Sequence, residues 1–127
     1  MKGHRDLVAW QKAMHLVKAV YTVTRNFPKE EVYGLTSQLR RAAASVPSNL
    51  AEGHGRLSRK EFRQFIGRAR GSLLEVETQL EIAQELRYLN RLSASELLAA
   101  SSELGRLLNG LRQWSERNID TDPDDGP

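Results

Sequence analysis

The sequence predicts an all-α protein, an antiparallel up-and-down bundle of four helices. Apolar residues recur at spacings of three and four along most of the 127 residues, and no segment alternates as a half-buried strand does. The connections between these segments are short, as neighbouring antiparallel helices require. The length corresponds to one domain, which we place at residues 1–117, followed by an acidic tail at residues 118–127 that we expect to be disordered.

The first predicted helix starts after Asp6, a suitable N-cap, and runs to about Phe27, where Pro28 stops it. Two apolar stripes cover more of this helix than one core contact needs, so we expect it to pack on two sides, the second of which could be another subunit. The first stripe is Leu7, Trp10, Met14, Val17 and Tyr21, and the second is Ala9, Ala13, Leu16, Val20, Val23 and Phe27.

The second helix is expected to begin within residues 29–35 and to reach about Glu52. Pro47 lies inside it and predicts a kink, because proline lacks the backbone donor and crowds the preceding turn. Gly53 and Gly55 should end it in a left-handed cap. Its predicted core face is Val32, Leu35, Leu39, Ala42, Ala43, Val46 and Leu50.

Two capping boxes predict where the remaining helices begin, Ser58 to Glu61 and Ser93 to Glu96. The third helix should end near Leu89. Its core positions repeat every 3.5 residues, which is typical of left-handed bundle packing. These positions are Phe62, Ile66, Ala69, Leu73, Val76, Leu80 and Ala83, and those of the fourth helix are Leu97, Ala100, Leu104, Leu107, Leu108, Leu111 and Trp114.

The inventory of reactive residues argues against an enzyme. The chain has no cysteine, which excludes disulfides, thiolate metal sites and thiol nucleophiles. His4, His15 and His54 show no metal-binding spacing, and no glycine loop of the phosphate-binding kind is present. We therefore expect no catalytic residue, no metal, no cofactor and no small-molecule substrate. No apolar run is long enough to span a membrane and no signal peptide opens the chain, so we expect a soluble cytoplasmic protein without a membrane partner.

The charge is +3, and four of the sixteen acids are the aspartates of the tail, so the rest of the chain is more basic than this total indicates. If the second helix ends where the third begins, the basic residues gather at one end, where a phosphate backbone would bind. These candidates are Arg40, Arg41, Arg56, Arg59, Lys60, Arg63, Arg68 and Arg70. Alternatively, Arg59, Arg63 and Arg70 form ion pairs within or between subunits with Glu77, Glu81 and Glu85, which share their face.

A polar stripe on the second helix is either a solvated face or a functional surface. It consists of Arg41, Ser45, Asn49 and Glu52, flanked by Gln38 and Ser48. Glu52 lies in the last turn, where the helix dipole disfavours an anion, so we expect Arg56 to pair with it. On the third helix, Gly67 and Gly71 lie one turn apart and predict the close approach of another helix.

Several segments resemble the four-helix bundle family of 23S rRNA intervening-sequence proteins, over about residues 5–115. The most specific is Ser-Val-Pro-Ser-Asn-Leu-Ala-Glu-Gly at residues 45–53; the others are at residues 8–13, 27–28, 33–42, 55–56 and 69–75. The acidic tail lies outside the family pattern.

This resemblance implies a homopentameric ring without catalytic activity. It also marks family-motif or interface positions, which are Trp10, Arg41, Ser45, Pro47, Asn49, Glu52 and Gly53. A distant branch of the family binds nucleic acid and a reverse transcriptase, but this chain departs from that branch in its motifs. The partners of that branch are therefore not transferred to this chain. Because the basic end would attract a phosphate backbone, we expect an accessory protein that binds RNA or DNA there; the alternative is an oligomeric scaffold whose partner is another protein.

Overall fold

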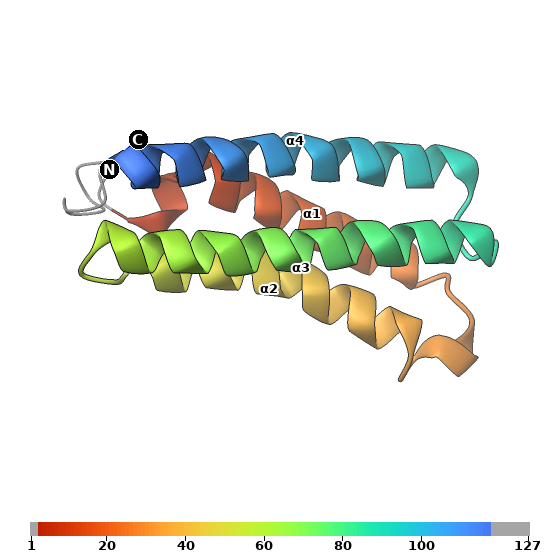
Figure 1. The fold of residues 1–127 in the computed structure, drawn as a ribbon. Helices are drawn as coiled ribbons and strands as arrows, with labels where there is room; N and C mark the ends of the chain where they lie inside the picture. The colour runs from red at the N-terminus through yellow and green to blue at the C-terminus, as the bar shows by residue number, and fades with distance from the viewer. Residues whose placement is uncertain (1–2, 118–127) are drawn as a thin grey trace.

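The structure is a computed structural model that describes residues 3–117. Four helices pack side by side, and the described residues contain no strand, so the all-α prediction is confirmed (Figure 1). The helices are α1 (Val8–Thr24), α2 (Leu35–His54), α3 (Arg59–Glu85) and α4 (Arg91–Arg117), with short 3-10 turns at η1 (His4–Asp6) and η2 (Lys29–Glu31). The tail predicted at residues 118–127 lies outside the described residues.

One hydrophobic core runs through the bundle and takes residues from all four helices. All seven predicted core positions of α3 are buried, which confirms the 3.5-residue pattern. On α4, Leu104 and Leu108 are fully buried, but Ala100 is exposed and does not belong to the core as predicted. Of the four neighbouring helix pairs, α2 and α3 pack most extensively and α1 and α4 least.

Helix α1 buries its second apolar stripe more completely than its first, although Leu7 of the first stripe also lies in the core. Ala13 and Val20, from the second stripe, are fully buried, whereas Met14 and Tyr21, from the first, are 43% and 41% exposed. Asp6 is not the N-cap: it lies in η1, and Leu7 occupies the cap position without a side-chain hydrogen bond. The part of the apolar face of α1 around Met14 and Tyr21 is therefore left partly uncovered within the described chain.

Helix α2 continues through Pro47 to His54, as the sequence predicts. Val46, Pro47 and Leu50 are buried, so core packing on both sides of the proline compensates for the lost backbone donor. Val32 was expected on the core face but is 52% exposed, because it precedes the first helical residue and does not follow the helical register.

The end of α2 is close to α3. A Cβ at Gly53 would lie 2.5 Å from the Cβ of Phe65 and 3.1 Å from Cδ1 of Phe62, so glycine allows this approach. The predicted left-handed cap is wrong, since Gly55 has a φ of −77°. At the end of α3 it is Arg87 that takes a positive φ, 63°, in a Schellman motif closed by the Tyr88 N–H donating to the carbonyl of Ala83. This motif ends α3 at Glu85, ahead of the predicted Leu89.

Of the two predicted capping boxes, one lies at the start of its helix. The Glu61 N–H donates to Oγ of Ser58 at 3.2 Å, and α3 begins at Arg59. Helix α4 instead begins at Arg91, because the Ser93 N–H donates to Oδ1 of Asn90 at 2.8 Å. Asparagine is as good an N-cap as serine, so the earlier residue takes this role.

Candidate functional site

The polar stripe of α2 contacts α3 through one of its residues. Oγ of Ser45 lies 2.8 Å from Oγ of Ser72 on α3, and Nδ2 of Asn49 donates to the carbonyl of Ser45 at 2.8 Å and to its Oγ at 2.9 Å. Glu52 accepts from Arg56 at 2.8 Å, which confirms the predicted pairing. Ser45 therefore joins α2 to α3, Asn49 supports Ser45 from within α2, and Arg41 is exposed and takes no part in these hydrogen bonds.

Arg59 lies in the interior, although the sequence placed it among the exposed cations. Its side chain is 2% exposed, and its guanidinium carbon lies 3.4 Å from the centroid of the Trp114 ring. Trp114 makes an edge contact with Phe62, and Phe62 makes another with His54. This aromatic cluster joins the ends of α2 and α4 to the start of α3, and it removes Arg59 from the set that could contact a phosphate backbone.

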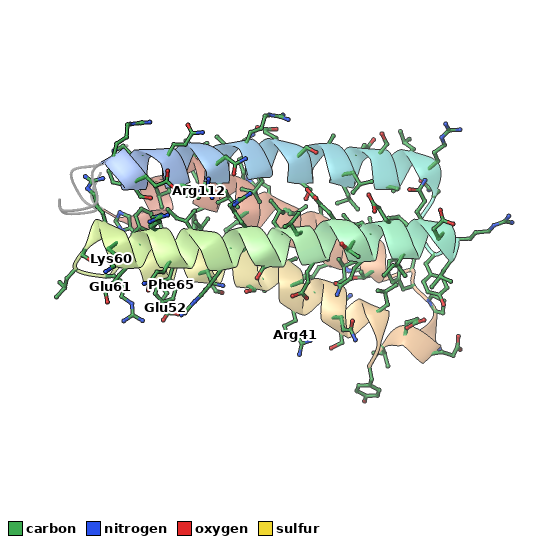
Figure 2. All side chains as sticks on the ribbon, in the orientation of Figure 1. Arg41, Glu52, Lys60, Glu61, Phe65 and Arg112 are labelled. Atoms are coloured by element: carbon green, nitrogen blue, oxygen red, sulfur yellow. The ribbon has the colours of Figure 1, made fainter. Side chains whose placement is uncertain are left out.

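Four cationic side chains of α3 and α4 line one depression, with a volume of about 310 Å³, which we call the basic depression. Figure 2 shows Lys60 at the start of α3 and Arg112 of α4 between the two helices. One carboxylate reaches this group, since Glu116 lies 3.4 Å from Arg63 and 3.6 Å from Arg112. The lining residues are Lys60, Arg63, Gln64, Gly67, Arg70 and Arg112.

Gly67 contributes no side chain to this surface. A Cβ at Gly67 or Gly71 would have no atom of the described chain within 4 Å, apart from its own helix and sequence neighbours. The prediction that these glycines admit another helix is therefore not met within residues 3–117. At Gly67 the effect is to leave open space within the basic depression.

Arg112 was missed by the sequence analysis, which searched only the second and third helices for cations. The pairing of Arg63 with Glu116 shows that the last turns of α4 lie beside the first turns of α3. The short connections could have predicted this neighbourhood, and with it the position of Arg112.

The other predicted cations do not all join the basic depression. Arg56 and Arg68 lie over the ring of Phe65, with guanidinium carbons 4.8 and 4.5 Å from its centroid. Arg40 donates to Oγ1 of Thr24 at 2.8 Å and so belongs beside the end of α1. Arg41 is also separate from Lys60 (Figure 2). The expectation of one basic end holding all these residues is therefore wrong, because α2 places Arg40 and Arg41 several turns before its end.

On the face of α3 that carries both signs of charge, Arg63 pairs with a carboxylate of α4. Glu77 accepts a hydrogen bond from Ser101 of α4 at 3.1 Å, and Glu81 and Glu85 are exposed. The carboxylate that pairs with Arg63 is that of Glu116. The ion pair of Arg63 thus joins α3 to α4 within one chain.

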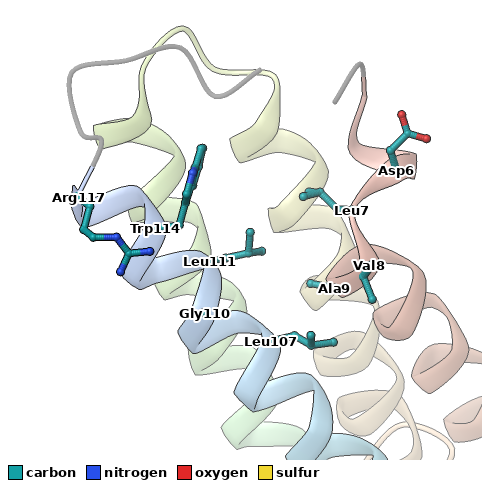
Figure 3. Close-up of a pocket in the computed structure, with 9 residues that line it drawn as sticks. All are labelled: Asp6, Leu7, Val8, Ala9, Leu107, Gly110, Leu111, Trp114 and Arg117. Carbon is teal, nitrogen blue, oxygen red and sulfur yellow. The ribbon is translucent and has the colours of Figure 1, made fainter. Parts of the chain in front are cut away.

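A largely apolar groove runs between α1 and α4, which we call the α1–α4 groove. It has a depression of about 400 Å³ near the start of α1 and another of about 470 Å³ near its end. In the first, Leu107 and Leu111 of α4 face Leu7 and Ala9 (Figure 3). Between the two, Lys12 pairs with Glu103 at 3.3 Å. Val8, which is 54% exposed, is the α1 residue with a large exposed apolar side chain among those that line the first depression.

Residues 3–117 contain no group of three His, Cys, Asp or Glu side chains that could hold a metal ion. Within the same residues, no helix combines the length and the apolar character needed to cross a bilayer.

Comparisons with known proteins identify the family. A search of curated proteins found no match. The fold is similar to the crystal structure of a protein of unknown function from the S23 ribosomal protein family of Bacteroides thetaiotaomicron VPI-5482, with a TM-score of 0.75, 21% identity, and coverage of 84% of this chain and 99% of that one. The family model described as 23S rRNA-intervening sequence protein matches residues 5–110. This match covers most of the chain, which therefore belongs to the 23S rRNA-intervening sequence protein family.

Proposed function

We propose that this chain is a non-enzymatic accessory protein that binds RNA by its phosphate backbone through the basic depression. The observation that supports this proposal is the gathering of Lys60, Arg63, Arg70 and Arg112 around one concave surface. Arginine presents a planar fork of donors that matches phosphate oxygens, and three of these four cations are arginines. The open space at Gly67 would let a phosphate approach the α3 backbone.

The aromatic residues nearby favour backbone contacts over base stacking. Phe65 is 5% exposed and is covered by Arg56 and Arg68, and Arg59 lies over the ring of Trp114. Sequence-specific RNA recognition generally needs aromatic faces on which splayed bases stack. We therefore propose binding that depends on RNA shape and charge and little on sequence.

We also propose that the bundle is antiparallel and up-and-down, and that it assembles into a homopentameric ring. Contacts between residues early in one helix and late in the next support the topology, as between Arg63 and Glu116, and farther along between Glu77 and Ser101. The uncovered apolar surface of α1, with Met14 43% exposed, supports the assembly. A head-to-tail contact closes into a ring when its rotation permits.

Salt-dependent RNA binding tests the function. In the double variant Arg63→Gln and Arg70→Gln, structured RNAs of different sequence should bind more weakly by a similar factor. The slope of log affinity against log salt should flatten by about one unit for each lost contact. The matched control is Arg25→Gln with Arg91→Gln, which removes the same charge from exposed residues at the end of α1 and the start of α4.

The result that would overturn the proposal is equal RNA affinity of the two double variants, or no RNA binding by the parent protein. In that case the α1–α4 groove supports the second candidate, a scaffold whose partner is a protein, because its lining is largely apolar. The oligomeric mass, measured on the same samples, distinguishes loss of assembly from loss of RNA contacts.

A further inference from the structure

The basic depression lies where α4 ends. Lys60 is the second residue of α3, and Arg112 lies five residues before Arg117, the last residue of α4. Residues 118–127, outside the described part, follow directly and contain Asp120, Asp122, Asp124 and Asp125. Four carboxylates thus lie within the eight residues that follow α4. The last turns of α4 form one wall of the depression.

We infer that the acidic segment of residues 118–127 binds the basic depression when no nucleic acid is present and competes with RNA for it. The consequence for RNA rests on the proposed function, whereas the contact itself can be tested without RNA. A carboxylate from this part of the chain already reaches the same cations, since Glu116 pairs with Arg63 and Arg112. The aspartates extend this pattern of charge beyond the helix.

The segment is long enough for this contact. The depression extends along α3 from Lys60 to Arg70, about 15 Å at 1.5 Å per residue. Asp125 follows Arg117 by eight residues and can reach about 26 Å in an extended chain. The segment is therefore longer than the depression, and its last aspartates have the greatest reach along it.

The chemistry favours reversible competition over a permanent lock. Exposed ion pairs are individually weak and are screened by salt, but tethering keeps the local concentration of the segment high. RNA presents a denser row of negative charges than four aspartates, and it gains from released counterions. The segment would therefore give way to a strongly charged backbone and would reduce binding of weaker polyanions.

Exchanging all four aspartates for asparagine in the full chain tests this inference. The matched control exchanges Glu75, Glu81, Glu85 and Glu96 for glutamine, because these exposed carboxylates lie outside the basic depression and their loss changes the net charge equally. The first readout needs no RNA: the NMR shifts of the Nε–H groups of Arg63 and Arg112 should differ between the parent and the asparagine variant. The difference should fade as salt rises.

The second readout is RNA affinity at low salt. We expect the asparagine variant to bind roughly threefold to tenfold more tightly than the parent, with a steeper salt slope, because a few exposed ion pairs no longer compete. The control should gain distinctly less. Arginine shifts that are the same in the parent and the asparagine variant would overturn the inference. If these shifts differ but neither protein binds RNA, the contact is supported and the proposed function fails.

Discussion

The guanidinium carbon of Arg59 lies 3.4 Å from the centroid of the Trp114 ring, and both side chains lie where α3 begins and α4 ends. A cation buried to 2% exposure needs such a partner, because removing a charge from water is costly. This pair therefore stabilises the end of the bundle.

Arg59→Gln should lower the free energy of unfolding by about 2 kcal/mol, the value of a desolvated cation–aromatic contact. Arg63→Gln should change it by no more than about 0.5 kcal/mol, because the Arg63 side chain is 46% exposed and its ion pair with Glu116 is solvated. Urea denaturation of the two variants measures both values. Equal stabilities would contradict the structural role given to Arg59.

Gly53→Ala should destabilise the protein by about 1–3 kcal/mol, because the new methyl group would overlap Phe65 and force α2 away from α3. Gly71→Ala is the matched comparison. It places the same methyl group in open space on an exposed helix position, so it should stabilise the fold by about 0.5–1 kcal/mol. A loss of stability in Gly71→Ala would indicate that another helix approaches this position in the assembled protein.

Tyr88 donates a hydrogen bond from its hydroxyl to Oε2 of Glu31 at 2.9 Å, and this bond raises the pKa of Tyr88. Smaller contributions come from burial and from the charges of Glu31 and Glu30. The folded protein therefore holds the phenol proton more tightly than the unfolded chain. This contribution to stability is complete below the ordinary tyrosine pKa of about 10 and is lost as the pH rises through the raised value.

The measurement is the denaturation midpoint between about pH 9 and 11, where unfolded tyrosine ionises. The midpoint of Tyr88→Phe should fall less steeply with pH than that of the parent, because phenylalanine removes the titrating group and keeps the ring beside Phe27. Parallel pH profiles would show that the hydrogen bond to Glu31 does not form in solution.

Light scattering should report a mass several times 14.4 kDa, as the uncovered surface of α1 predicts. Met14→Glu, at a position that is 43% exposed, should reduce this mass without unfolding the bundle, because a carboxylate is costly in an apolar interface. Thr78→Glu adds the same charge on an exposed position of α3, away from α1, and should leave the mass unchanged. A monomeric parent protein would contradict the assembly.

The sequence predicted the helices and their buried residues better than it predicted the contacts between helices. Periodicity located the seven core positions of α3 between Phe62 and Ala83, because spacing within one helix is enough to place them on its buried face. The prediction that Val32 is buried failed, because Val32 precedes α2 and helical spacing does not apply to it. The prediction for Arg59 failed because its charge was taken as a sign of exposure, although it lies seven residues before Ile66 and continues the core spacing of α3. Only the packing of α4 shows that Trp114 covers it. Sites that depend on two helices need their relative placement, which periodicity within one helix does not contain.

The α1–α4 groove also has a consequence for the order of folding. Lys12 and Glu103 meet across it from positions separated by most of the chain, whereas α2 and α3 are joined by a short turn and pack most extensively. Closing the larger loop costs more entropy, so the α2–α3 hairpin should form early and α1 should join α4 late. In the folded protein the contact between α1 and α4 should open most often, and the amides of α1 should exchange with deuterium before those of α3. A subunit bound over the groove would slow that exchange, which makes hydrogen exchange in α1 a direct reporter of assembly.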